Sequence, residues 1–440
     1  MKNVFLTEYS INGIKNLNKE VTLSFYKKTI TKPIDTQSYN MKAVYGMNGS
    51  GKSGIIASVD ILKNLLINPD YLNNTLVQNS LHELINKKTQ ELHISVQYLI
   101  NHKATTYLYH YMIDLTLKND RYTIFHEELE YRNAFSTSGK WKKVFVTNDG
   151  NLTFPDQSDE MEIRDFYSKS INLLSTTSLS ALLSINKDTA KETPFFQHLL
   201  SLIIFGTNLH VSTESQDDHR SYLIPDNLET LFNYNDVLKM YKKSSRRNIN
   251  VFQVPETRVT KDSYPDYEQK THNLLHFLQL FKPELKDIEI SRKEDKYSYE
   301  CTLIMIYDDY RVNVEFESTG IKKLIRLYTY LLEMVNGGIV FIDEFDANLH
   351  DVYLCALLEY LMMFGEGQLC FTTHNISSMN VLNQNKKSID FISMDHEIVA
   401  WRKNGNYSPA SLYREGMITG SPFNIFPTSF VGNLDPEEND

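Results

Sequence analysis

The stretch Gly46-Met47-Asn48-Gly49-Ser50-Gly51-Lys52-Ser53 decides the fold. Its pattern of glycine, four spacers, glycine, lysine and serine is that of a phosphate loop. A short apolar strand is predicted over 41–45 and an amphipathic helix over 52–66, which is the context that such a loop needs. Backbone N–H groups would surround a β-phosphate, Lys52 would span the β- and γ-phosphates, and Ser53 would ligate Mg²⁺. The residues expected to bind nucleotide here are Gly46, Asn48, Gly49, Ser50, Gly51, Lys52 and Ser53.

A second apolar strand ends in two acidic residues. Residues 339–342 read Ile-Val-Phe-Ile and are followed by Asp343 and Glu344. The pattern predicts a buried parallel strand whose carboxyl end lies at the edge where α/β proteins bind ligands. Asp343 would hold Mg²⁺ through its water shell, and Glu344 would orient or deprotonate the attacking water. Because strands that end in Asp-Glu are common, this interpretation depends on the segments that follow.

A third strand, predicted over 368–372, leads into Thr373 and His374. A neutral imidazole at that strand end can hydrogen-bond the γ-phosphate or the attacking water. A lone histidine is more often a satisfied surface residue, but its place in the strand order favours the catalytic interpretation. We therefore predict Glu344, Lys52 and His374 as the catalytic residues.

The fourth segment is Glu317-Ser318-Thr319-Gly320, which immediately precedes an amphipathic helical pattern. Ser318 and the amide of Gly320 would form an anion site at the start of that helix. A helix cap alone also explains Ser318, so both interpretations stay open.

The order GMNGSGKS, ESTGIKK, IVFIDEFDANLH and FTTH resembles the ABC-type ATPases of the SMC and RecF kind. It is most similar to the ATPase of the overcoming-lysogenization-defect family and its abortive-infection relatives in anti-phage defence. The resemblance implies ATP and Mg²⁺ as cofactors and a head-to-tail homodimer, with higher oligomers left open. Ser318 and Gly320 of one subunit would close over the ATP held by Lys52 of the other. The loop that contains Asp346 would cross the dimer interface, and Gln97 would be a candidate Mg²⁺ contact, although it lies in an alternating strand pattern.

The sequence also departs from these relatives. Only 264 residues separate Ser53 from Ser318, too few for the long coiled-coil arm of SMC proteins. The 66 residues after His374 contain no Asp-x-Asp, so we expect no TOPRIM nuclease domain. Glu268 and Lys270 superficially resemble a nuclease Glu-x-Lys, but they fall in a polar stretch without a strand pattern.

The expected fold class is α/β, an ABC-type P-loop NTPase head with a mixed central sheet. Strands at 91–100, 106–117 and 121–130 would form an antiparallel β layer beside the nucleotide. Helical spacing from about 160 to 240 predicts an inserted helical lobe, and the polar stretch 244–270, with two prolines, predicts a loop or linker. The expected domains are 1–158 and 271–432 for the two parts of the ATPase head, 159–270 for the lobe and linker, and 433–440 for a disordered acidic tail.

Composition limits partners only weakly. The 440 residues include 45 basic and 55 acidic side chains, a net charge of −10 that argues against a broad phosphate-binding surface. Local basic pairs leave nucleic-acid binding open, although a solvated face explains each of them. Three widely spaced cysteines and the lack of an apolar run of roughly 18 residues predict free thiols, a cytoplasmic location and no membrane partner. The basic pairs are Lys242-Lys243, Arg246-Arg247 and Lys322-Lys323, and the cysteines are Cys301, Cys355 and Cys370.

From these segments we expect a dimeric ATPase that acts as sensor and scaffold in anti-phage defence and controls a separate effector such as a nuclease. Two alternatives stay open. One is a RecF-like ATP-dependent DNA-binding repair protein, and the other is a nucleotide-binding module with negligible turnover.

Overall fold

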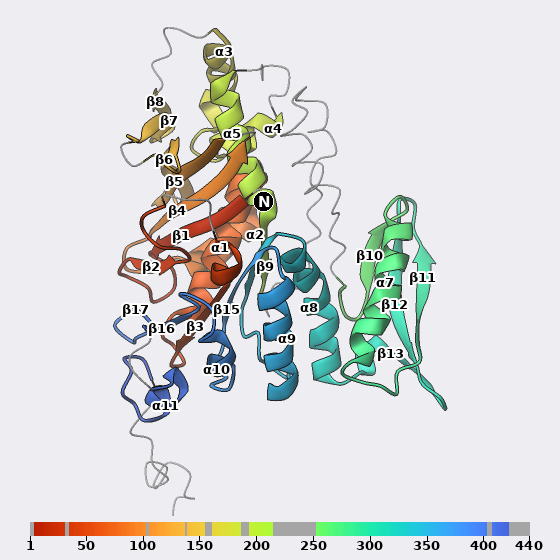
Figure 1. The fold of residues 1–440 in the computed structure, drawn as a ribbon. Coiled ribbons are helices and arrows are strands. Elements are labelled where there is room, and N and C mark those ends of the chain that lie inside the picture. Colours follow the sequence, from red (N-terminus) through yellow and green to blue (C-terminus); the bar gives the residue numbers. More distant parts are fainter. Residues whose placement is uncertain are drawn as a thin grey trace, which may run out of the picture.

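The computed structural model describes residues 4–30, 35–102, 105–136, 139–154, 161–185, 193–213, 252–402 and 407–421. Within them, a mixed central sheet, a large antiparallel sheet and a smaller antiparallel sheet carry the fold, with helices between and beside them (Figure 1). The predicted α/β class, with a mixed central sheet and an antiparallel layer, is therefore confirmed.

The central sheet holds the strand that precedes the phosphate loop. Its order is β17-β16-β3-β15-β14-β9, and all neighbours are parallel except the edge pair β16 and β17. Because the carboxyl ends of parallel strands open at one edge, the loops after β3, β15 and β14 meet there. The strands are β3 (Met41–Gly46), β9 (Leu209–Ser212), β14 (Ile339–Ile342), β15 (Gln368–Thr372), β16 (Ile389–Ile392) and β17 (Ile398–Ala400).

The antiparallel sheet has the order β2-β1-β4-β5-β6-β7-β8 and forms the upper left of the view in Figure 1. Alternating apolar positions along these strands predict it, because one face packs into the core. Its strands are β1 (Val4–Asn12), β2 (Val21–Ser24), β4 (Glu91–His102), β5 (Thr105–Lys118), β6 (Arg121–Asn133), β7 (Lys142–Asn148) and β8 (Asn151–Phe154).

A buried glutamine hydrogen-bonds from the central sheet to the antiparallel sheet. The Gln368 side chain accepts from the backbone N–H of Leu6 at 2.7 Å and donates to the Leu6 carbonyl at 2.9 Å. The register of β1 against β4 shifts between Leu6 and Glu8, next to that contact. The irregularity in β1 therefore lies where its backbone pairs with a side chain of β15.

Helix α1 (Lys52–Ile67) begins at the phosphate loop and lies almost wholly inside the protein. Thirteen of its sixteen residues are buried, more than the expected amphipathic helix would bury. The reason is that later helices also pack on it and share its core. The other α-helices described before strand β9 are α2 (Thr75–Leu84), α3 (Met161–Ser170), α4 (Leu179–Ile185) and α5 (Pro194–Asn208).

The prediction of a loop or linker is wrong for the described part of that stretch, from 252 to 270. It forms strand β10 and the start of helix α7 (Figure 1). Pro265 does not break α7, because it stands in the first turn, where proline fits a helix. Tyr267, Leu274 and Leu278 then recur at helical spacing on its buried face. The elements of this part are β10 (Thr257–Thr260), α7 (Tyr264–Gln279), β11 (Asp287–Glu294), β12 (Ser298–Ile306) and β13 (Arg311–Asn313).

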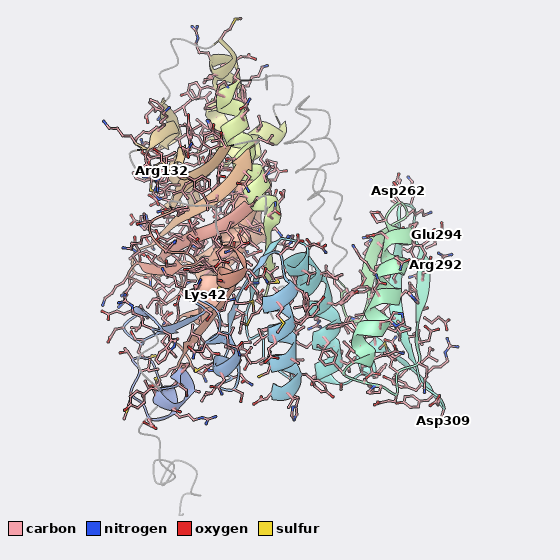
Figure 2. All side chains as sticks on the ribbon, in the orientation of Figure 1. Lys42, Arg132, Asp262, Arg292, Glu294 and Asp309 are labelled. Carbon is pink, nitrogen blue, oxygen red and sulfur yellow. The ribbon has the colours of Figure 1, made fainter. Side chains whose placement is uncertain are left out.

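We call β10 to β13 with α7 the small lobe. It packs on the first turns of α8 through Ile321, Leu324 and Tyr328, whereas Leu331 of α8 packs into the core of the central sheet. Helix α8 thus joins the small lobe to the rest of the protein, and the outer edge of the lobe is charged, with Arg292 and Glu294 labelled there (Figure 2). The helices after the small lobe are α8 (Thr319–Val335), α9 (Asp351–Phe364), α10 (Ser378–Leu382) and α11 (Pro409–Arg414).

Some expectations concern residues outside the described part of the chain, namely the two basic pairs at 242–247 and the tail at 433–440. The three cysteines are free thiols. Of the third basic pair, Lys322 donates to the carbonyl of Glu315 at 3.0 Å, and Lys323 is buried. Among the described helices, none combines the length and the apolar character that crossing a bilayer takes.

Candidate nucleotide-binding site

The loop after β3 turns through two glycines with positive φ. Gly49 has φ 80° and Gly51 has φ 104°, a region that glycine reaches without steric cost. A Cβ at Gly49 would meet no atom within 4 Å, so the space beside it is open. A Cβ at Gly51 would lie 2.4 Å from Leu17, so this position also needs glycine for space. The side-chain amide of Asn16 donates to the carbonyl of Gly49 and holds the loop from the β1–β2 connection.

Lys52 folds back onto its own loop. Its Nζ donates to the carbonyl oxygens of Gly46 at 2.9 Å and Met47 at 3.0 Å. Burial lowers the pKa of Lys52, and the carboxylates of Asp343 and Glu344 oppose that shift. The ammonium group therefore lies within electrostatic reach of the acids that follow β14.

The donors of the loop fit a phosphate group. The Ser50 hydroxyl is fully buried and has no hydrogen-bond partner, which is unusual for a buried polar group. It lies in the same turn as Gly49, where space is open, and Lys52 contributes its ammonium from the first turn of α1. The open space beside Gly49 and the Lys52 ammonium fit the predicted triphosphate, whereas the Ser50 hydroxyl lies against Gly46 and does not face that space. Ser53, the predicted Mg²⁺ ligand, is the second residue of α1 and is half-buried.

The acids after β14 are held by a threonine of the neighbouring strand. The Thr372 hydroxyl donates to Asp343 Oδ1 at 2.5 Å and accepts from the backbone N–H of Glu344 at 2.8 Å. Glu344 has φ 48°, a left-handed conformation that is uncommon outside glycine and that often occurs at functional sites. This geometry turns the chain sharply and fixes the two successive carboxylates at the strand end.

His374 lies at the end of the neighbouring strand β15. Burial and the nearby Lys52 ammonium lower the pKa of His374, and Asp346 and Asp343 oppose them. The lowered pKa favours the neutral imidazole at pH 7. The next residue, Asn375, donates to Asp351 at the start of α9. This bond ties the His374 segment to the end of the loop that contains Asp346.

The Ser318 segment starts α8, and the Ser318 hydroxyl accepts from the backbone N–H of Ile321 at 3.4 Å as the N-cap. The structure therefore confirms that Ser318 caps this helix. Gly320 lies against the loop after β14, because a Cβ on it would come within 2.8 Å of the Asn348 carbonyl oxygen. The structure thus brings the Ser318 segment and the Asp346 loop together in one chain.

Gln97 is not part of this arrangement, which corrects its prediction as a Mg²⁺ contact. It lies on β4, where its side chain donates to Glu8 Oε1 at 3.1 Å. Glu8 is near enough to Lys387 to affect its pKa, and Lys387 precedes β16. Since β16 runs parallel to β3, that end of the sheet is opposite the phosphate loop. The alternating pattern around Gln97 indicated a strand residue, and the structure has one.

Sequence reasoning missed two residues of the site. Thr372 stood inside the quoted motif, but nothing in its position revealed that its hydroxyl joins Asp343 to the backbone of Glu344. Asn16 lies in the connection between two predicted strands, 33 residues before Gly49, and no local signal places it at the loop.

Comparisons with known proteins found a family match for part of the chain. Residues 212–380 match the family described as "AAA domain, putative AbiEii toxin, Type IV TA system". No curated protein matches the chain. Three solved structures are similar at low identity. The Smc head domain with an extended coiled coil bound to the C-terminal domain of ScpA, from Pyrococcus furiosus, is 13% identical, with 90% of this chain and 96% of that chain covered and a TM-score of 0.40.

The SMC head domain from Thermotoga maritima is 12% identical, with 90% of this chain and 99% of that chain covered and a TM-score of 0.31. The recombination mediator protein RecF-ATPrS of the RecFOR pathway is 12% identical, with 91% and 99% covered and a TM-score of 0.39. The stretch from 212 to 380, which carries Ser318, Asp343, Glu344 and His374, is therefore similar to an AAA-type ATPase domain.

Proposed function

We propose that this protein binds and hydrolyses ATP. The observation that carries the proposal is the meeting of Lys52, the Asp343-Glu344 pair and His374 at the carboxyl ends of three adjacent parallel strands. Hydrolysis of a phosphoanhydride needs charge stabilisation and an oriented water more than it needs covalent chemistry. These residues supply both.

Each residue has a distinct task in this mechanism. Lys52 moves its ammonium from the loop carbonyls to the β- and γ-phosphates, and the N–H groups of the loop hold the β-phosphate. Glu344 orients the attacking water and takes its proton. Neutral His374 hydrogen-bonds the γ-phosphate or the water. Ser53 and Asp343 would hold Mg²⁺, which when bound neutralises phosphate charge.

The complete site would need a second subunit. Ser318 and Gly320 stand at the start of α8, where free N–H groups and the positive end of the helix favour an anion. Gly320 also contacts the loop that contains Asn348. In a head-to-tail dimer these two segments would reach the ATP held by Lys52 of the partner subunit, so ATP would join the subunits and its hydrolysis would release them.

The Glu344→Gln variant tests this part of the proposal. It should bind ATP and form a dimer that persists, because the amide cannot take the proton of the attacking water. Light scattering with and without ATP should show a doubled mass for the variant and only a transient one for the wild type. Equal, near-zero turnover in both proteins would instead indicate a binding module without catalysis, and normal turnover in the variant would show that Glu344 is not the base.

We further propose that the ATPase is the sensor and scaffold of an anti-phage defence system and controls a separate effector. The support is the similarity of residues 212–380 to the family whose description includes a putative AbiEii toxin, together with the order of the motifs. Purification of the complex from cells, with its mass and its bound proteins identified, tests this role. A partner retained with Glu344→Gln and lost with Lys52→Ala would support it. Defence by this chain alone with no copurifying partner would contradict it.

A further inference from the structure

A buried carboxylate lies directly before the N-cap of α8. Glu317 is only 7% exposed. Its Oε2 accepts from Lys282 Nζ at 2.9 Å and from the backbone N–H of Ser318 at 3.3 Å, and its Oε1 accepts from the Tyr307 hydroxyl. Lys282 Nζ also lies 4.5 Å from the centre of the Tyr307 ring. We call Glu317, Lys282 and Tyr307 the brace.

The brace gathers three segments that are distant in sequence. Lys282 follows α7, Tyr307 follows β12, and Glu317 follows the short helix η6 (Val314–Phe316). The first two belong to the small lobe, whereas Glu317 belongs to the segment that starts α8. Any shift of the small lobe against α8 must therefore change the contacts of Glu317.

The charge of the brace matters because of where it lies. Burial raises the pKa of Glu317, but the hydrogen bonds from the Tyr307 hydroxyl and Lys282 lower it by more. The pKa of Glu317 therefore lies below its ordinary value. The side chain is thus ionised at neutral pH, one residue from the predicted contact of Ser318 with phosphate. A bare carboxylate there would repel a γ-phosphate, and the Lys282 ammonium cancels that charge.

We infer that Glu317 is a positioning residue for the nucleotide of the partner subunit. Through its bond to the Ser318 amide it fixes the start of α8, and Lys282 and Tyr307 fix its position and neutralise its charge. This inference rests on the proposed function. It also makes the small lobe the element through which a ligand or partner bound there would change ATP turnover.

Three variants separate charge from shape. Lys282→Met leaves the carboxylate without its cation and should lower kcat about a hundredfold, with ATP affinity for the Lys52 site within about twofold. Glu317→Gln should lower kcat about tenfold. The double variant should return to the level of Glu317→Gln, because removing both charges removes the repulsion. The control is Glu315→Gln, the same change on an exposed neighbour, which should match the wild type.

A mixing experiment then tests whether the brace acts across the dimer. Lys282→Met and Lys52→Ala chains, each of low activity, are combined in equal amounts. In the mixed dimer, one of the two sites has an intact loop and an intact α8 start, so turnover should recover to about one quarter of wild type. A structural defect within one chain would not be rescued in this way.

The outcomes distinguish the inference from the proposed function. Turnover by Lys52→Ala alone would overturn the proposed function. Where Glu344→Gln forms the ATP-dependent dimer, an inactive Lys52→Ala with no recovery on mixing would overturn only the inference, and so would a fully active Lys282→Met. If thermal unfolding shows that Lys282→Met is misfolded, Tyr307→Phe replaces it in the mixture, since it removes a single hydroxyl. A Tyr307→Phe protein with unchanged kcat would then overturn the inference.

Discussion

The two halves of the proposed site are built in different ways. At the edge of the central sheet, Lys52, Asp343 and His374 stand at the ends of adjacent strands, and bonds such as that of Thr372 run from strand to strand. At the start of α8, Ser318 and Gly320 depend on side chains of the small lobe that hold Glu317. In the proposed dimer, the first half would bind nucleotide within one chain. The second can change whenever the small lobe moves, which suits a part that responds to a partner.

The largest effect is expected from Lys52→Ala. The ammonium of Lys52 hydrogen-bonds the loop carbonyls of Gly46 and Met47, so it stands at the turn that would hold the phosphates. Without it, the β- and γ-phosphates lose their charge partner, and ATP affinity should fall by more than about a hundredfold. Isothermal titration with ATP and with ADP measures this. A loss confined to turnover, with binding intact, would show that the Lys52 ammonium does not contribute to phosphate binding.

Gly320→Ala tests the other half and should separate turnover from binding. An alanine Cβ would lie 2.8 Å from the Asn348 carbonyl, so α8 or the loop must shift. Misplacement of about 1 Å near reacting groups can cost a hundredfold in rate. We expect kcat to fall by that order while ATP affinity stays within about twofold. Gly139→Ala, in the half-buried connection between β6 and β7, is the control. An equal loss of ATP binding in Gly320→Ala would mean that the two halves act within one chain.

The difference between the halves also explains what sequence could predict. Asp343, Glu344 and His374 were found because each stands where an apolar strand ends, and Lys52 because the loop after such a strand has the phosphate-loop pattern. Chemistry and secondary structure therefore coincide in short stretches. Thr372 lies inside such a stretch, but its role depends on a contact with another strand.

The small lobe was harder to predict. Its α7 begins in a polar stretch with a proline, and its packing partners come from β12 and α8. The brace joins Lys282 and Tyr307 to Glu317 across up to 35 residues, and no periodicity reports such a contact. Gln97 shows the converse error. The family resemblance suggested a contact with Mg²⁺, whereas the alternating pattern around Gln97 correctly indicated a strand residue, and its side chain donates to Glu8.

Thr372→Val should have a smaller effect on the edge of the central sheet. Valine has nearly the shape of threonine, but it leaves the backbone N–H of Glu344 and Oδ1 of Asp343 without the hydroxyl that joins them. Residues that orient ligand groups typically change activity by 10 to 100-fold, so we expect about a tenfold loss of kcat and a higher Mg²⁺ requirement. Thr372→Ser keeps the hydroxyl and should retain most activity. If serine and valine behave alike, the hydroxyl does not position these acids.

The smallest effect on turnover is expected far from both halves, at a buried carboxyl group in the antiparallel sheet. Glu127 accepts from the Tyr111 hydroxyl at 2.8 Å and from the backbone N–H of Leu179 at 3.1 Å, at the start of α4. Burial raises the pKa of Glu127 to about 7, although both donors lower it. The folded protein therefore binds a proton here that the unfolded chain releases at lower pH.

The sign of the pH dependence follows from that shift. A carboxyl group with a raised folded pKa contributes stability that is complete below its unfolded pKa and is lost as pH rises through about 7. Between pH 5 and 8 this loss is on the order of 2 kcal/mol. Glu127→Gln, which cannot ionise, should gain stability relative to the wild type as pH rises across that window, even if the amide costs a constant amount at every pH.

Urea unfolding at pH 5 and 8 measures the gain. The control is Glu83→Gln, which changes an exposed carboxyl group paired with Lys87 and should show no gain. Since neither residue touches the nucleotide edge, kcat of both variants should match the wild type, and a changed kcat in Glu127→Gln alone would mean that the antiparallel sheet is coupled to catalysis.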